Sequence, residues 1–229
     1  KNNNNIYSKG DVTVDGDVKS KGQLLSEGSL EVKGNLDSEN IVYGKEEIKV
    51  GKNLKNVSDT QSEGNITVSE DTVNTGTVIA EGNIETENLD NSGEILTNEK
   101  LSSKNIDNKS TGKINTGNGI STSGNVVNQG TMNTNGDLTV TGNFENNNTV
   151  NAGGTLTAKD VVNTGALKIS DKIVSRGTVF TNSGEILTEN LDVDVSGNII
   201  NSNKIIILDN AKLKGNSITN QNYISATNM

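Results

Sequence analysis

The sequence contains no cysteine, histidine, tryptophan or proline among its 229 residues, and Arg176 is its only arginine. A chain without cysteine forms no disulfides and has no thiol chemistry. A chain without histidine lacks the commonest general base and metal ligand. We therefore expect no catalytic residue, no metal site and no cofactor, and we predict that the protein is not an enzyme.

Aromatic residues make up 2 % of the chain, the net charge is −9 and the pI is about 4.6. With no basic cluster, this composition argues against binding to nucleic acid. No signal peptide opens the chain, and no apolar run approaches the length of a membrane span. The most apolar run, Ile205-Ile206-Ile207-Leu208, is predicted to be a buried strand, so membrane insertion is not expected.

What the chain does have is a six-residue period. In its first quarter an aliphatic residue occupies every sixth position, and glycines often lie two residues before it. A fixed short period is typical of solenoids, and glycine lets backbones turn or approach closely. The aliphatic residues of this hexad are Val12, Val18, Leu24, Leu30, Leu36, Val42, Ile48 and Leu54.

Three hexads make one coil, because the second apolar position is large only every third time. These larger residues are Val14, Val32, Val50 and Val68. The implied coil has about 18 residues, which gives roughly twelve coils in 229 residues. Charges eighteen residues apart alternate in sign, which favours the same register because neighbouring strands lie ~4.8 Å apart. The alternating columns are Lys9/Glu27/Lys45/Glu63, Lys19/Asp37/Lys55, Glu31/Lys49 and Lys21/Glu39.

From residue 74 onward a second marker replaces the strict hexad. It is an Asn-x-Gly or Asn-x-Asn triplet followed two residues later by an aliphatic residue. Asparagine and glycine tolerate left-handed backbone, so we predict turns here, with the asparagines stacked in hydrogen-bonded ladders. The triplets begin at Asn74, Asn91, Asn128, Asn163, Asn182, Asn201 and Asn220. A second corner is predicted at Gly82-Asn83, Gly124-Asn125, Gly136-Asp137 and Gly197-Asn198.

The segment from Val127 to Val140, VNQGTMNTNGDLTV, resembles the filamentous-haemagglutinin-type repeats of large bacterial exoproteins. These include two-partner-secretion adhesins, contact-dependent inhibition proteins and autotransporter passengers. The resemblance covers roughly residues 73 to 225, while residues 10 to 56 are also similar to bactofilin-like and hexapeptide-repeat helices. It implies a right-handed parallel β-helix that forms an extended shaft. The spacing alone leaves the hand open, because a strict hexad also suits a left-handed helix.

Some parallel β-helices are polysaccharide lyases or hydrolases, which need clustered carboxylates along a sugar groove. The candidate acids are Asp192 and Asp194, which would share one face of a strand. Neighbouring coils supply no matching acids, so we interpret this pair as a solvated strand face. Glu46-Glu47 and Glu70-Asp71 are interpreted as solvated turns for the same reason.

The predicted fold is therefore all-β, a right-handed parallel β-helix with about 18–19 residues per coil. Residues 1–229 are expected to form one continuous β-helical shaft fragment. Within it, residues 1–9 are expected to be disordered or to lead into the first coil, 10–72 to form strict hexad coils, and 73–229 to form haemagglutinin-like coils. Neither end offers an obvious cap, so we expect the rod to continue in a longer chain.

The function expected from this resemblance is structural. The chain would be the shaft of a secreted or cell-surface bacterial adhesin, extracellular or associated with the outer membrane, that holds a binding or toxin-bearing tip. Its partners would be flanking coils of the same chain, with host-cell or bacterial-surface receptors reached through other regions. Two alternatives stay open: a shaft that itself binds host glycans or proteins through a Thr/Asn-rich flat face, and a bactofilin-like self-assembling filament in the cytoplasm.

Overall fold

The computed structural model describes residue 1 and residues 3–229; Asn2, which belongs to the predicted lead-in segment, lies outside the described residues. The chain is an all-β solenoid of parallel strands with about twelve turns of about 18 residues, and none of the described residues is helical. It divides into two compact units, residues 1–117 and 118–229, which are described separately. The predicted fold class is confirmed.

Unit 1 contains β1 to β17. Their bounds are β1 Ile6–Ser8, β2 Val12–Val14, β3 Val18–Ser20, β4 Leu24–Ser26, β5 Leu30–Val32, β6 Leu36–Ser38, β7 Val42–Gly44, β8 Ile48–Val50, β9 Leu54–Asn56, β10 Asp59–Ser62, β11 Ile66–Val68, β12 Thr72–Asn74, β13 Thr77–Ala80, β14 Ile84–Asn91, β15 Glu94–Thr97, β16 Lys100–Asn108 and β17 Lys113–Thr116.

Unit 2 contains β18 to β33. Their bounds are β18 Gly119–Thr122, β19 Val126–Asn128, β20 Thr131–Thr134, β21 Asp137–Val140, β22 Phe144–Asn146, β23 Thr149–Ala152, β24 Leu156–Ala158, β25 Val161–Asn163, β26 Ala166–Ser175, β27 Phe180–Asn182, β28 Glu185–Asp194, β29 Asn198–Asn201, β30 Lys204–Ile207, β31 Ala211–Lys214, β32 Ser217–Asn220 and β33 Tyr223–Ser225.

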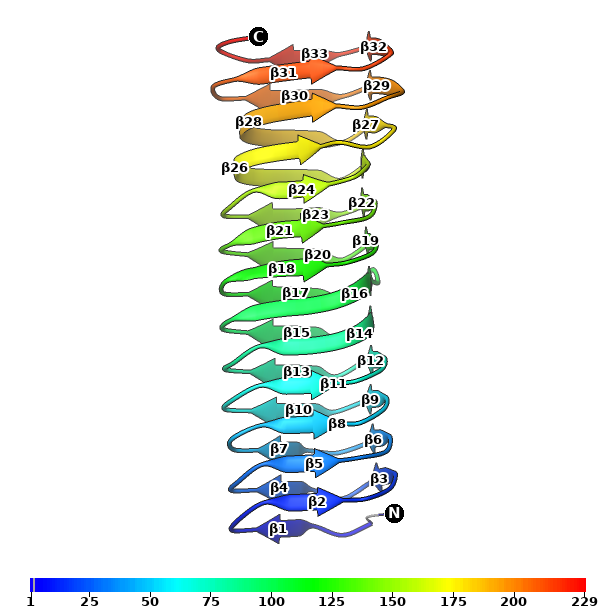
Figure 1. The fold of residues 1–229 in the computed structure, drawn as a ribbon, viewed down its shortest axis with the longest axis vertical. Coiled ribbons are helices and arrows are strands. Elements are labelled where there is room, and N and C mark those ends of the chain that lie inside the picture. The colour runs from blue at the N-terminus through cyan, green and yellow to red at the C-terminus, as the bar shows by residue number, and fades with distance from the viewer. Residues whose placement is uncertain (2) are drawn as a thin grey trace. The chain divides into compact units, whose positions relative to one another are not determined.

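Each coil of either unit has three short faces, which we name by their place in Figure 1. The front face carries strands such as β2, β5 and β8, the side face β3, β6 and β9, and the rear face β1, β4 and β7. Front strands point to the right and rear strands to the left while each unit climbs from its N-terminal to its C-terminal end (Figure 1). A chain that follows this course is a right-handed coil.

The hexad residues are the first inward-facing residues of strands β2 to β9, as predicted. Leu30, Leu36 and Ile48 are fully buried, and Leu30 pairs in register with Val12 and Ile48. The larger second position, Val14, Val32 and Val50, lies on the front face alone. Aliphatic side chains therefore stack on their own kind in continuous columns, which removes apolar surface from water at every coil.

Small differences in coil length fall at the corners. In register, Thr72 pairs with Leu54 eighteen residues before it and with Leu89 seventeen residues after it. The shorter corner keeps its residues extended, so β14 runs from the front face onto the side face without a break. Glu94 pairs with Lys113 nineteen residues on, because the corner before β17 holds an additional turn. Corners tolerate such changes because they carry no inward side chain.

The corner glycines allow close approach of backbones instead of left-handed turns. A Cβ at Gly64 would lie 1.7 Å from the carbonyl oxygen of Glu46, and one at Gly76 would lie 2.0 Å from that of Ser58. Among the described residues only Gly119 has a positive φ, of 139°. The chain turns at the Asn-x-Gly triplets, as predicted, but without the left-handed backbone that we expected there, because the asparagine ends a strand and turns its side chain inward.

Candidate functional site

The most extensive polar arrangement in each unit is a buried ladder of asparagine side chains. In unit 1 it contains the last residues of β9, β12, β14 and β16, and in unit 2 the last residues of β19, β22, β25, β27, β29 and β32. All of these except the final one are fully buried. Within each unit, the Nδ2 of every ladder residue except the last donates to the Oδ1 of the next asparagine at 2.8–2.9 Å. We call these residues the asparagine ladder: Asn56, Asn74, Asn91 and Asn108, then Asn128, Asn146, Asn163, Asn182, Asn201 and Asn220.

Every step of the ladder also binds the corner backbone. The Nδ2 of Asn74 donates to the carbonyl of Gly76 at 3.1 Å and to that of Glu94, in the next coil, at 3.0 Å. An amide side chain has two N–H groups and an acceptor oxygen, so it can satisfy carbonyls that the corner removes from the sheet. The ladder confirms the predicted stacking. The triplet marker does not fit Asn56 or Asn108, and the predicted triplets omitted Asn146 although Asn146-Asn147-Asn148 with Val150 fits the marker. The marker also did not indicate that these side chains are buried.

A second polar column lies on the surface at the corner before the side face. The backbone N–H of Asn35 donates to Oδ1 of Asp17 at 2.7 Å, and Asn53 Nδ2 donates to Oδ1 of Asn35 at 3.0 Å. The pKa of Asp17 is lowered by these hydrogen bonds from Asn35. Asn125 at one predicted Gly-Asn corner accepts from the backbone N–H of Asn143 before the side face, and Asn83 at another accepts from that of Lys100 before the front face. These side chains link one coil to the next.

The predicted charge columns exist in register, and some form ion pairs. Lys19 lies 3.0 Å from Asp37 and 2.8 Å from Glu39, while Lys21 lies 3.6 Å from Glu39. Their side chains are between about a quarter and a half exposed, so each pair contributes little to stability.

Other members of these columns take different partners. Lys49 pairs with Glu47 at 2.5 Å and not with Glu31 in the strand beside it. Glu27 and Glu63 accept hydrogen bonds from Tyr7 and Tyr43, which the sequence did not indicate.

The candidate acids Asp192 and Asp194 lie on the outer surface of β28, with the inward-facing Leu191, Val193 and Val195 between and beside them. The Oδ2 of Asp192 lies 2.6 Å from Nη2 of Arg176 and 3.1 Å from Nζ of Lys172. Burial raises the pKa of Asp192, but the hydrogen bonds and charges of the two cations outweigh burial and lower it. Asp194 pairs with Lys214 at 3.1 Å.

This geometry suits ion pairing more than proton transfer. A general acid needs a raised pKa so that it holds its proton near neutral pH, whereas the pKa of Asp192 is lowered. Within the described residues there is also no group of three or more acidic side chains placed to hold a metal ion.

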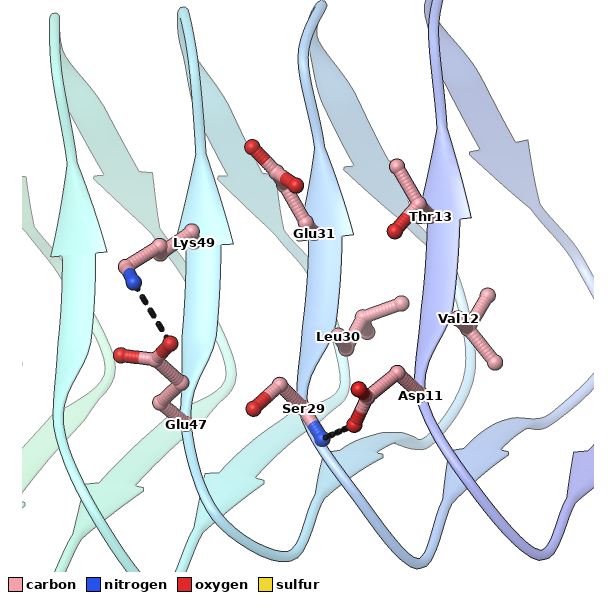
Figure 2. A pocket seen from close by; sticks show the side chains of 8 residues that line it. All are labelled: Asp11, Val12, Thr13, Ser29, Leu30, Glu31, Glu47 and Lys49. Atoms are coloured by element: carbon pink, nitrogen blue, oxygen red, sulfur yellow. Dashed lines mark hydrogen bonds and ion pairs between the residues drawn. The ribbon is translucent and has the colours of Figure 1, made fainter.

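Three surface hollows, one in unit 1 and two in unit 2, are shallow. The hollow in Figure 2 lies across β2, β5 and β8, where Thr13, Glu31 and Lys49 point outward from consecutive strands. Its volume is about 240 Å³, and two hollows on the rear face of unit 2 measure about 290 and 260 Å³. Pockets for small molecules usually enclose about 300–1,000 Å³. These hollows are spaces between stacked side chains of a flat sheet.

Comparison with protein-family models, with curated proteins and with solved structures found no significant match. No helix in the described part of the chain could span a membrane.

Proposed function

We propose that this chain is a structural module, part of the shaft of a secreted or surface-anchored bacterial exoprotein of the filamentous-haemagglutinin type, and that it has no catalytic role. The observation that carries the proposal is the unbroken stacking within each unit. Aliphatic columns, strand ladders and the asparagine ladder all bind each coil to the next. Such repetition makes a stack that can be lengthened coil by coil, because each coil contacts only its neighbours.

The surface supports a mechanical role in a second way. Many of its charged side chains bond to neighbouring coils, as Asp192 does to Arg176 and Lys172. The three hollows described above are smaller than ordinary ligand pockets. A shaft needs stiffness and solubility, which the buried columns and the net charge of −9 provide. A tip domain elsewhere in the exoprotein would perform binding or toxicity.

Localisation tests this proposal. Antibodies against residues 118–229 should label intact cells of the organism that encodes the chain, and mild protease treatment of those cells should remove the label. An antibody against a cytoplasmic protein, applied to the same cells, controls for leakage. Label that appears only after the cells are permeabilised would contradict an exported shaft. If that label also formed filaments, the bactofilin-like alternative would replace the proposal.

A further inference from the structure

The rear face of unit 1 carries an unusual column of outward-facing side chains. In a chain with only three tyrosines and two phenylalanines, two of the tyrosines lie in this column, with three aliphatic residues. The members follow one another in strand register from β1 to β15. We call them the tyrosine strip: Tyr7, Leu25, Tyr43, Gln61, Ile79 and Leu96. Tyr7 is 56 % exposed and Leu96 36 %, and the others are half-buried.

Both tyrosine rings are held in the same way. The hydroxyl of Tyr7 donates to Glu27, and the hydroxyl of Tyr43 donates to Glu63 at 2.6 Å; each glutamate is twenty residues further along the chain. Each acceptor belongs to the next coil, two residues beyond the strip residue of that coil. The rings therefore lean in the same direction, and their orientation is fixed before any ligand arrives, which lowers the entropy cost of binding.

The spacing of the rings suits a repeating ligand. Tyr43 lies two coils from Tyr7, with Leu25 between them. At ~4.8 Å per coil the rings are about 9.6 Å apart. In a linear β-linked glycan, sugars of the same orientation recur once per disaccharide, a comparable distance. Aromatic rings offer flat apolar faces to the C–H faces of sugars, while polar neighbours such as Gln61 reach hydroxyl groups.

The size of the strip argues against a folded protein partner. Six strands span five spacings of ~4.8 Å, and a three-residue strand is about 10 Å long, so the strip covers roughly 240 Å². A stable protein interface buries about 800 Å² on each partner. An extended peptide lying along the strip would find few free backbone groups either, because β4, β7, β10 and β13 already pair with strands on both sides and only β1, among the strip's strands in the described residues, pairs on one side. With a folded protein and an extended peptide both disfavoured, the strip suits a narrow linear ligand of another kind.

The charges around the strip restrict the ligand further. Glu27, Glu63 and Glu81 all lie close enough to Tyr43 to raise its pKa, to about 12, with the hydrogen bond to Glu63 as the largest cause. The column that contains these carboxylates also contains Lys9 and Lys45, so its five charged side chains have a net charge of −1. It offers no basic cluster to attract a sulfated or uronic-acid polymer.

We propose that the tyrosine strip binds a linear β-linked glycan that carries no negative charge, with Tyr7 and Tyr43 stacking on sugars one disaccharide apart. The inference does not depend on the proposed shaft function, since a cytoplasmic filament would expose the same strip.

The test is a titration of the full 229-residue chain by calorimetry with cellohexaose, a glucosamine hexamer and a heparin hexasaccharide. We expect the first two to bind and heparin not to bind. Tyr43→Ala should weaken binding at least tenfold, and Tyr43→Phe, which keeps the ring but loses the bond to Glu63, about threefold. Tyr223→Ala is the matched control, because Tyr223 is 50 % exposed on the rear face of unit 2, outside the strip. It should leave affinity unchanged.

Tyrosine fluorescence provides a second readout that needs no substitution. The chain has no tryptophan, so its emission comes from three tyrosines, and stacking of a sugar on two of them should change it. Absence of binding by both uncharged and amino-sugar hexamers would overturn the proposal, as would equal losses in Tyr43→Ala and Tyr223→Ala. If hexalysine bound and cellohexaose did not, the strip would be a site for basic peptides, which would also overturn the proposal.

Discussion

Replacing one rung of the asparagine ladder tests what holds the coils together. Asn146 is fully buried in unit 2, where ladder residues Asn128 and Asn163 lie on either side of it. Its Nδ2 donates to Oδ1 of Asn163 at 2.8 Å and to the carbonyls of Asn148 and Ala166 at 3.1 Å each. Its Oδ1 accepts from Nδ2 of Asn128 at 2.8 Å. The same Oδ1 accepts from the backbone N–H of Asn148 at 3.3 Å. Alanine at this position would remove five hydrogen bonds and leave buried partners without a replacement.

The size of the effect follows from these bonds. A hydrogen bond contributes about 1 kcal/mol net, and a buried group left unpaired costs about 1–3 kcal/mol. Two N–H groups serve three acceptors, so the bonds are not fully additive. We therefore expect Asn146→Ala to lower the free energy of unfolding by about 3–5 kcal/mol. At roughly 2–4 °C per kcal/mol for a chain of this length, the melting temperature should fall by ~10 °C.

The adjacent residue supplies the matched control. Asn147 is exposed, and its side chain bonds only with Glu145 and Thr164 at the surface. Asn147→Ala should change the free energy of unfolding by less than about 0.5 kcal/mol. Asn146→Leu, which fills the space but cannot bond, should destabilise the chain about as much as Asn146→Ala. Thermal unfolding followed by circular dichroism measures all three. Equal, small losses at residues 146 and 147 would refute the reasoning, and full rescue by leucine would show that packing matters and hydrogen bonding does not.

Three further predictions concern stability and use the same thermal assay. Gly64→Ala should destabilise the chain by about 1–3 kcal/mol, because its Cβ would clash with the carbonyl oxygen of Glu46 in the neighbouring coil. Gly10→Ala should be neutral, because no atom lies within 4 Å of the added Cβ. Equal losses would contradict close packing at the corners. Leu138→Asp places a charge in a fully buried column and should lower the free energy of unfolding by more than about 4 kcal/mol. Asp194→Asn should change it little, because the ion pair of Asp194 with Lys214 is exposed. Similar effects of the two substitutions would disprove the packing of the columns. Folding lowers the pKa of Asp192, so its ion pairs stabilise the chain fully above pH 3.8, the ordinary pKa of the group, and are lost as the pH falls further and the carboxylate is protonated. Asp192→Asn should therefore make the free energy of unfolding fall less steeply in acid. An unchanged dependence on pH would argue against that role.

The aliphatic columns were the part of the fold that could be predicted most directly from the sequence. A strand has a side-chain period of two, and a three-residue strand with a three-residue corner repeats every six residues, so the period specifies the inward positions. The positions of Leu30 and Leu36 in the core follow from this argument. The alternation of Asp192 and Asp194 toward the surface of β28 follows in the same way.

The asparagines show where this reasoning stopped. Asparagine beside glycine predicts a left-handed turn when only local preferences are considered. In the structure Asn74 ends a strand and faces inward, because the coil on either side offers an asparagine at the same position and the corner offers unpaired carbonyls. A buried amide is costly unless it is bonded, and only the neighbouring coils supply those bonds.

The tyrosines were missed for a similar reason. Tyr43 and Glu63 are twenty residues apart, and no local pattern connects them. The register of the coils brings the glutamate beside the ring, two residues past the position that a strict eighteen-residue repeat would place next to it. A sequence shows that these residues exist, but the side-chain direction that joins them depends on how the corner is built.

The sequence by itself therefore determined the class of fold, the length of a coil and the residues that fill its core, because all three depend on a period that can be counted. Only the tertiary structure decided the hand of the coil, the inward direction of the asparagine ladder and the partners of the surface charges. These depend on atoms of neighbouring coils that are about eighteen residues away in the chain but one strand spacing away in space.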